Sequence, residues 1–149
     1  LPGAGAAGGL GFALMAFLGA RLEPGVELVA RAVGLAEAVS GADLVLTGEG
    51  SVDAQTLAGK TPAGVARVAA AQGVPTVIVA GRVRPGAEVL LTTGCVALMS
   101  SSQGDVVPLA EVLRAAPQST ERATATVMRL WTHRSGPAGS VVDPADPAA

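Results

Sequence analysis

Two short apolar runs in the middle of the chain are separated by a segment with helical periodicity. Residues 43–47 (DLVLT) and 75–80 (PTVIVA) are almost continuously apolar, as in strands that are buried on both faces. Between them, Val65, Val68 and Ala69 recur at the spacing of one helix face. A strand, a helix and a second strand in this order predict two parallel strands joined by a crossover helix. The pattern therefore predicts an α/β fold, a parallel sheet with flanking helices.

The helix of this unit has clear boundary signals in the sequence. Thr61 has the chemistry of an N-cap, and Pro62 suits the first helical position. Gly73 follows the last periodic residue and is typical of a helix end. We therefore expect the helix to begin just after Thr61 and to end before Gly73.

Weaker patterns extend this unit in both directions. Apolar residues at three- and four-residue steps predict one amphipathic helix over residues 24–39. After the second strand, a weaker helical segment is expected at 86–92, a third short strand at 95–99, and two helices at 109–114 and 118–133. In the last helix, the predicted buried face carries Ala123, Val127, Leu130 and Trp131.

The two ends of the chain differ from its middle. Residues 3–20 pass from small residues to a large apolar stretch, which predicts a buried helix packed closely against its neighbours. Its apolar run, residues 8–20, is shorter than the roughly 20 residues that cross a bilayer, so no membrane span is expected. Residues 135–149 are rich in Pro, Gly, Asp and Ala without periodicity, which predicts a disordered tail.

Composition narrows the classes of function. The 149 residues carry a formal net charge of −2 and include no Tyr, two Phe and one Trp, so neither a basic patch nor an aromatic platform for nucleic acid is expected. A single cysteine, Cys95, and a single histidine, His133, predict neither a disulfide nor a structural metal site, and favour a cytoplasmic protein. Cys95 is expected to be a small core residue.

Polar residues that can carry chemistry follow the predicted strands. In parallel α/β sheets, ligands bind outside the carboxyl ends of the strands, which places three segments, 48–60, 81–84 and 100–104, at one edge. The first segment combines the carboxylates of Glu49 and Asp53 with Lys60 near a helix N-terminus. These groups suit magnesium and phosphate. The alternative is a solvated loop in which Asp53 only caps a turn.

Two motif matches in the sequence are incomplete. Residues 3–8 (GAGAAG) match the dinucleotide-binding pattern, but no strand precedes them, so a dehydrogenase is not favoured over close packing or backbone approach to an anion. Residues 54–61 (AQTLAGKT) resemble a P-loop with Ala54 in place of the first glycine. A true P-loop is not expected. Lys60 beside a helix N-terminus nevertheless offers a phosphate the same two features, a positive charge and free backbone N–H groups.

Arg82 and Arg84 lie at the end of the second predicted strand. Guanidinium groups at this edge can bind a carboxylate or a phosphate. The alternative is that both arginines are only solvated surface residues.

Three blocks of the sequence together resemble the glycerate kinase family, the type that makes 2-phosphoglycerate. They are residues 2–20 (PGAGAAGGLGFALMAFLGA), 43–69 (DLVLTGEGSVDAQTLAGKTPAGVARVA) and 75–81 (PTVIVAG). The resemblance implies transfer of the γ-phosphoryl group of ATP to a hydroxyl of glycerate, with Mg²⁺, in a two-domain α/β enzyme of the Rossmann or flavodoxin-like kind. Its active site would lie in the cleft between the domains.

The resemblance also implies roles for individual residues. Asp53 and Glu49 would bind magnesium or the glycerate hydroxyl, and Lys60 with the helix end at Thr61 would bind phosphate. Ser51 stands where many members have arginine, so that charge is either missing or supplied elsewhere. Further substrate- or nucleotide-binding positions would be Gly5, Gly8, Gly9, Gly48, Gly50, Gln55 and Gly59.

The sequence resembles only the C-terminal part of these longer kinases. Residues 1–42 would then end the family's second domain, residues 43–134 would complete the α/β kinase domain, and 135–149 would be the tail. We expect such a chain to be incomplete alone, and to associate with itself or with the missing N-terminal half through exposed apolar surface. The alternative function is a non-catalytic remnant or a small α/β module that binds a nucleotide or another anion.

Overall fold

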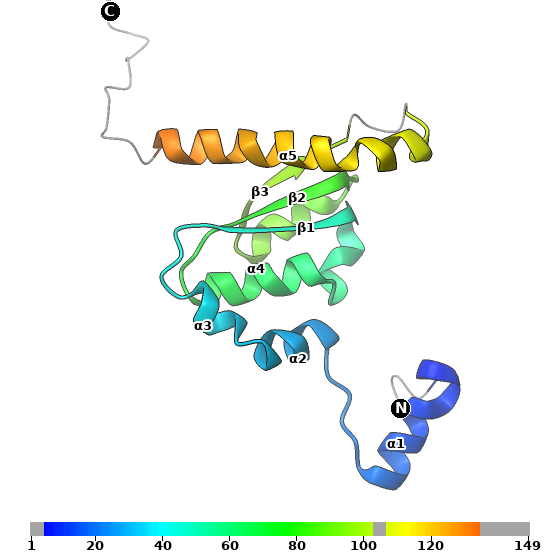
Figure 1. Ribbon diagram of the computed structural model, residues 1–149. Coiled ribbons are helices and arrows are strands. Elements are labelled where there is room, and N and C mark those ends of the chain that lie inside the picture. Colours follow the sequence, from blue (N-terminus) through cyan, green and yellow to red (C-terminus); the bar gives the residue numbers. More distant parts are fainter. Residues whose placement is uncertain (1–4, 103–106, 135–149) are drawn as a thin grey trace, which may run out of the picture.

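The protein is built around a three-stranded parallel sheet with helices on both faces (Figure 1). The computed structural model describes residues 5–102 and 107–134. The strands are β1 (Val45–Val52), β2 (Thr76–Val83) and β3 (Cys95–Ser100), and their order in the sheet is β1-β2-β3. Both strand pairs are parallel, as the sequence predicts for the first pair. The α/β class is therefore confirmed.

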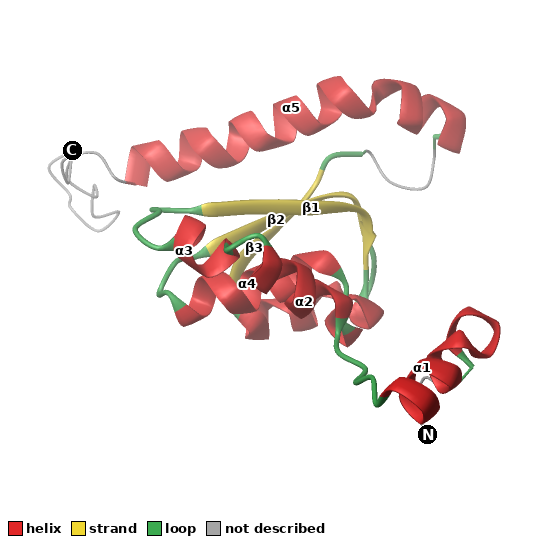
Figure 2. Cartoon of the chain, turned by 60° about the horizontal axis from the view of Figure 1, so that its bottom comes forward, coloured by secondary structure: helices red, strands yellow, loops and turns green. Residues whose placement is uncertain are grey.

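Different helices cover the two faces of the sheet. Helix α4 (Thr61–Ala71) and the 3₁₀ helix η3 (Ala87–Thr93) lie on one face, and the long helix α5 (Leu109–Arg134) crosses the other (Figure 2). On the α4 side, Ile78 and Ala80 of β2 pack with the small residues Ala63 and Ala66 of α4. On the α5 side, Val77 and Val79 of the same strand pack against Ala123 and Val127, while Leu130, expected on that buried face, is exposed.

The first strand is longer than the sequence predicts. The apolar pattern ends at Thr47, but pairing with β2 continues through Gly48, Glu49 and Ser51 to Val52. The polar run therefore does not leave the sheet, because the backbone of β1 stays hydrogen-bonded to β2 whatever its side chains are. The loop at the carboxyl edge begins at Asp53.

Two glycines allow β1 and β2 to approach closely near this edge. A Cβ atom at Gly48 would lie 2.2 Å from the carbonyl oxygen of Val79, and one at Gly81 would lie 2.5 Å from that of Gly50. Real Cβ atoms do not approach backbone atoms so closely, so no other residue fits at either position unless the strands move apart. Gly50 itself has open space where its Cβ would be.

Two helix predictions need correction. The helix expected at 24–39 is two helices, α2 (Gly25–Ala32) and α3 (Leu35–Val39), because Gly34 between them has a left-handed conformation with φ of +64°. The two helices expected after the third strand are one, α5, which continues through Pro117 although proline removes a backbone donor. The weaker helical segment expected at 86–92 is confirmed as the 3₁₀ helix η3.

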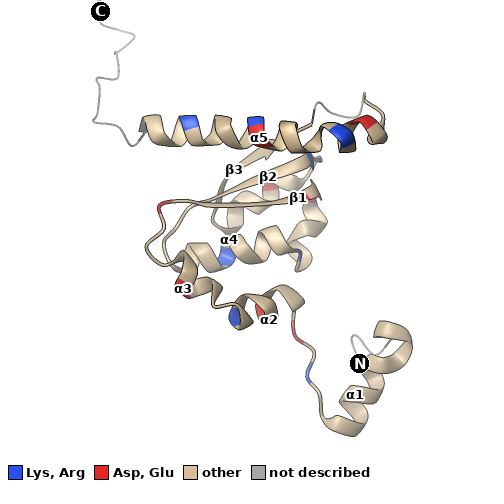
Figure 3. Ribbon diagram, in the orientation of Figure 1, with Lys and Arg blue, Asp and Glu red and all other residues tan. Residues whose placement is uncertain are grey.

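The N-terminal helix is not buried, contrary to the prediction. The 3₁₀ helix η1 (Ala6–Gly9) leads into α1 (Leu10–Leu18), which contains no buried residue; Phe17 is 82% and Leu18 76% exposed. In Figures 1 and 2, α1 stands apart from the sheet and its helices. Figure 3 shows that α1 also lacks charged residues. None of the helices within the described ranges is both long and apolar enough to span a membrane.

The close approach of β1 and β2 predicts how alanine substitutions at this edge affect stability. Gly48→Ala and Gly81→Ala should each lower the free energy of unfolding by about 2 kcal/mol, because the new methyl group must push the two backbones apart. Gly50→Ala is the matched control, and its effect should stay within about 0.5 kcal/mol. Urea unfolding of the purified variants, followed by circular dichroism, measures these changes. Equal stability of all three variants would contradict this account of the edge.

Candidate active site

Asp53 is held in place by a reciprocal cap with Thr56. It is the first residue after β1 and the N-cap of the 3₁₀ helix η2 (Ala54–Ala58). The Asp53 backbone N–H donates to Thr56 Oγ1 (3.1 Å), and the Thr56 hydroxyl donates to Asp53 Oδ1 (3.3 Å). Thr56 is fully buried, so the Asp53 carboxylate is attached to the protein core at the carboxyl edge of the sheet.

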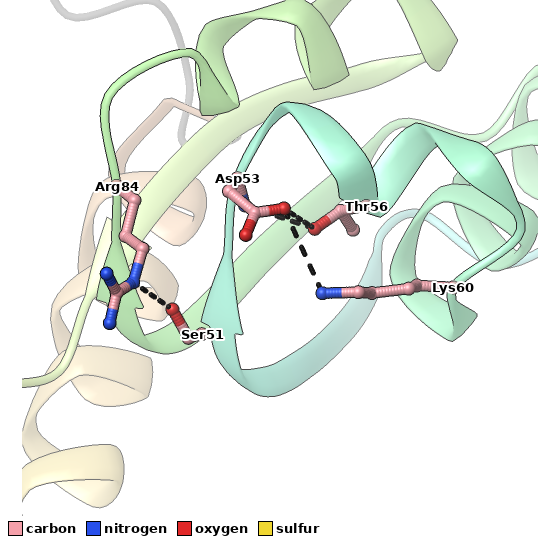
Figure 4. Close-up of polar contacts among 5 residues, drawn as sticks. All are labelled: Ser51, Asp53, Thr56, Lys60 and Arg84. Carbon is pink, nitrogen blue, oxygen red and sulfur yellow. Dashed lines mark hydrogen bonds and ion pairs between the residues drawn. The ribbon is translucent and has the colours of Figure 1, made fainter.

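Lys60 reaches the same carboxylate from the start of α4. Its Nζ lies 3.9 Å from Asp53 Oδ1 (Figure 4), with side-chain exposures of 39% for Lys60 and 30% for Asp53. Lys60, rather than Thr61 as predicted, is the N-cap residue of α4, and Pro62 stands in the first turn. Gly59, with φ of +104°, makes the turn between η2 and α4. The structure thus brings together the predicted carboxylate and lysine at one helix N-terminus.

A second cation lies at the edge of the sheet between β1 and β2. The Nε–H of Arg84 donates to Ser51 Oγ (3.0 Å), which joins the residue after β2 to the carboxyl-terminal part of β1 (Figure 4). The Arg84 backbone N–H also donates to the carbonyl of Val52, so the two strands remain joined one residue beyond β2. Arg84 is exposed. Arg84, one of the two arginines predicted as candidates from their place after a strand, therefore contacts Ser51.

The remaining predicted site residues are divided between this edge and the N-terminal segment. Glu49 is exposed on β1, opposite Ala80 of β2, and the exposed Gln55 and Thr61 lie in η2 and at the start of α4. Of the two strand glycines, Gly50 leaves open space, whereas Gly48 is required by strand packing. The other predicted positions, Gly5, Gly8 and Gly9, lie at η1, and the structure does not bring them to Asp53 (Figure 1).

The described residues offer no protein-only metal site. No group of three or more His, Cys, Asp or Glu side chains among them could hold a metal ion. Cys95 is buried, as predicted, and desolvation raises the pKa of its thiol above the ordinary value, so it is a core residue and not a nucleophile. The charged side chains that the structure places at this edge include Asp53, Lys60 and Arg84.

Sequence reasoning missed Thr56 and the contact between Ser51 and Arg84. The spacing of Asp53 and Thr56 is that of a capping box with threonine at its fourth position, and this signal could have identified the cap. The second contact joins residues 33 positions apart in the sequence, so only the register of β1 on β2 reveals it.

The fold and this edge define an α/β protein with a carboxylate and two cations at the carboxyl ends of its parallel strands, the edge at which such sheets bind ligands. The glycerate kinase family pattern matches residues 1–132. The chain therefore belongs to the glycerate kinase family.

Individual relatives agree with this assignment. The chain is 53% identical over 100 residues to a glycerate kinase of Halalkalibacterium halodurans, covering 67% of this chain and 26% of the relative. It is 53% identical over 81 residues to a glycerate 2-kinase of Escherichia coli, covering 54% of this chain and 21% of the relative. A crystal structure from Salmonella typhimurium LT2, provisionally described as glycerate kinase 2, matches with a TM-score of 0.65 and 35% identity over 91% of this chain and 34% of that one. The chain thus spans about a fifth to a third of the length of these relatives.

The cap at Asp53 can be tested with two buried threonines. Thr56→Val should lower the free energy of unfolding by about 1–2 kcal/mol, because the Asp53 backbone N–H loses its acceptor. Thr76 is also fully buried, but its Oγ1 has no hydrogen-bond partner among the described residues. The matched variant Thr76→Val should therefore be neutral or up to about 1 kcal/mol more stable. Urea unfolding compares the two, and an equal loss in both variants would show that the cap contributes nothing.

Proposed function

We propose that this chain forms part of an ATP-dependent glycerate kinase, which transfers the γ-phosphoryl group of ATP to glycerate and gives 2-phosphoglycerate. Membership of the glycerate kinase family supports the reaction and its two substrates. The name of the Escherichia coli relative, glycerate 2-kinase, supports the choice of product. The observation that carries the proposal is the placement of Asp53 and Lys60 together at the carboxyl edge of the sheet.

The chemistry of phosphoryl transfer fits this set of side chains. Its catalysis depends mainly on positioning and on neutralising the charge of the phosphoryl group, and needs no nucleophilic side chain. Lys60 and the start of α4 at Thr61 bind phosphate in this proposal, since free N–H groups at a helix N-terminus attract anions. The backbone at Gly50, where no side chain intervenes, allows a substrate to approach the edge of β1.

Asp53 and Glu49 are the proposed magnesium ligands or partners of the glycerate hydroxyl. Magnesium is commonly bound by one or two carboxylates together with substrate phosphates, and not by a cage of protein ligands alone. Asp53 is the first residue after β1 and Glu49 is exposed on that strand, so an ion that arrives with ATP need bind only one of the two carboxylates directly. Bound there, magnesium would neutralise charge on the transferred phosphoryl group.

The proposal includes the division of the chain into parts. Residues 1–42 would belong to the second domain of the kinase and residues 43–134 to the α/β domain, whereas the predicted tail, 135–149, lies outside the described residues. The exposed apolar side chains of α1, such as Phe12, Phe17 and Leu18, support the view that this helix packs against another part of the protein. We propose that the remainder of a kinase of family length covers them, and that the N-terminal glycines meet substrate there.

The two central residues can be tested in the full-length gene product. Asp53→Asn retains an oxygen that accepts from Thr56, so it removes the charge and keeps the cap. Lys60→Ala removes the proposed phosphate ligand. Each should lower kcat for glycerate phosphorylation by about 100-fold or more. The ion pair between them is half-exposed, so stability should fall by no more than about 1 kcal/mol.

Matched controls separate catalysis from general loss of charge. Asp43→Asn changes an exposed carboxylate just before β1, and Arg67→Gln changes an exposed cation on α4. Both controls should keep turnover within about twofold of the unmodified enzyme, as expected for surface positions away from a site. Near-normal turnover in Asp53→Asn and Lys60→Ala would contradict the assignment. A full-length protein that binds MgATP but never phosphorylates glycerate would favour the non-catalytic binding module instead.

A further inference from the structure

Arg84 is an exposed side chain held in a definite position. Its backbone is fixed by the bond from its N–H to Val52, and its side chain by the bond from Nε to Ser51. The next turn lies against the residue after Asp53, because a Cβ at Gly86 would lie only 3.3 Å from the Cβ of Ala54. The segments that carry Arg84 and Asp53 are therefore packed together at the edge of the sheet.

The bond between Ser51 and Arg84 does little for stability. A hydrogen bond between exposed side chains competes with water, and immobilising a long arginine side chain costs conformational entropy. The bond uses only Nε of the guanidinium. Its two Nη groups have no hydrogen-bond or ion-pair partner in residues 5–102 and 107–134, and they are the donors that bind carboxylates and phosphates in bidentate fashion.

The Asp53 carboxylate does not neutralise Arg84, because it forms its ion pair with Lys60. Lys60 and Arg84 therefore reach this edge from two different elements, α4 and the end of β2 (Figure 4). Two cations on either side of the loop that begins at Asp53 suit an anionic ligand with more than one charged group.

We propose that Arg84, positioned by Ser51, binds an anionic group of the substrates. This inference rests on the proposed glycerate kinase function. The group is either the carboxylate of glycerate or a phosphate of ATP, since both accept two parallel N–H bonds from one guanidinium. Arg84 is thus a substrate-binding residue and Ser51 a positioning residue.

Steady-state kinetics of the full-length gene product distinguish the two anions. Arg84→Gln should raise KM for one of them, glycerate or ATP, by about tenfold or more, the loss expected for a hydrogen bond to a charged group. Ser51→Ala should raise the same KM by about threefold, because Arg84 keeps its charge and loses only its support. In both variants kcat should change less than KM.

The exchange of the two residues is the most specific test of positioning. The double variant Ser51→Arg with Arg84→Ser moves the guanidinium from the residue after β2 to β1, on the other side of the same contact. It should recover at least part of the affinity that Arg84→Gln loses. Arg67→Gln is the matched control for an exposed arginine elsewhere, and both of its KM values should stay within about twofold.

The outcomes separate this inference from the proposed function. Normal KM values in Arg84→Gln, in an enzyme that phosphorylates glycerate, would overturn the inference and leave the function standing. If the unmodified protein does not phosphorylate glycerate, the proposed function is wrong. The role of Arg84 is then tested by measuring the binding of inorganic tripolyphosphate by calorimetry. Weaker binding by Arg84→Gln than by the unmodified protein would then support the inference. Equal binding, or no binding by either protein, would overturn it.

Discussion

The close approach of the β1 and β2 backbones at their carboxyl ends is the constraint on which the site depends. Gly48 and Gly81 permit it, because a side chain at either position would collide with a carbonyl oxygen of the other strand. The pairing therefore continues past the apolar part of β1, through Glu49 and Ser51, and carries them to the edge of the sheet. The same pairing brings Arg84 to Ser51 and sets the point at which Asp53 leaves the strand.

At this edge, a buried hydrogen-bonded residue holds the backbone while the charged side chains remain accessible to solvent. Thr56 is buried and joins the Asp53 backbone and carboxylate to the core, whereas Asp53, Lys60 and Arg84 retain exposed surface. A half-exposed ion pair contributes little to stability, so folding alone does not account for the placement of these charges at one edge. The position of each charge is nevertheless fixed by backbone elements, which is what phosphoryl transfer requires of a site.

The sequence predicts the α/β core and places Asp53 and Lys60 between the first strand and the next helix, because apolar strands and a well-marked helix leave strong local signals. The prediction of β1 is too short at its carboxyl end. The polar residues after Thr47 suggest a loop in the sequence, whereas in the structure they pair with β2. The sequence also wrongly predicts a buried α1, since apolar composition does not reveal whether a partner surface is present. The contact between Ser51 and Arg84 depends on strand register, and no local pattern around either residue indicates it.

A crystal structure of the full-length gene product with glycerate, magnesium and a non-hydrolysable ATP analogue tests the central claim most directly. The account predicts that substrate oxygens lie within hydrogen-bond distance of Lys60 Nζ and of the Arg84 guanidinium, with the carboxylate of Asp53 beside the metal or the glycerate hydroxyl. Both ligands bound at a site remote from Asp53, Lys60 and Arg84 would contradict it.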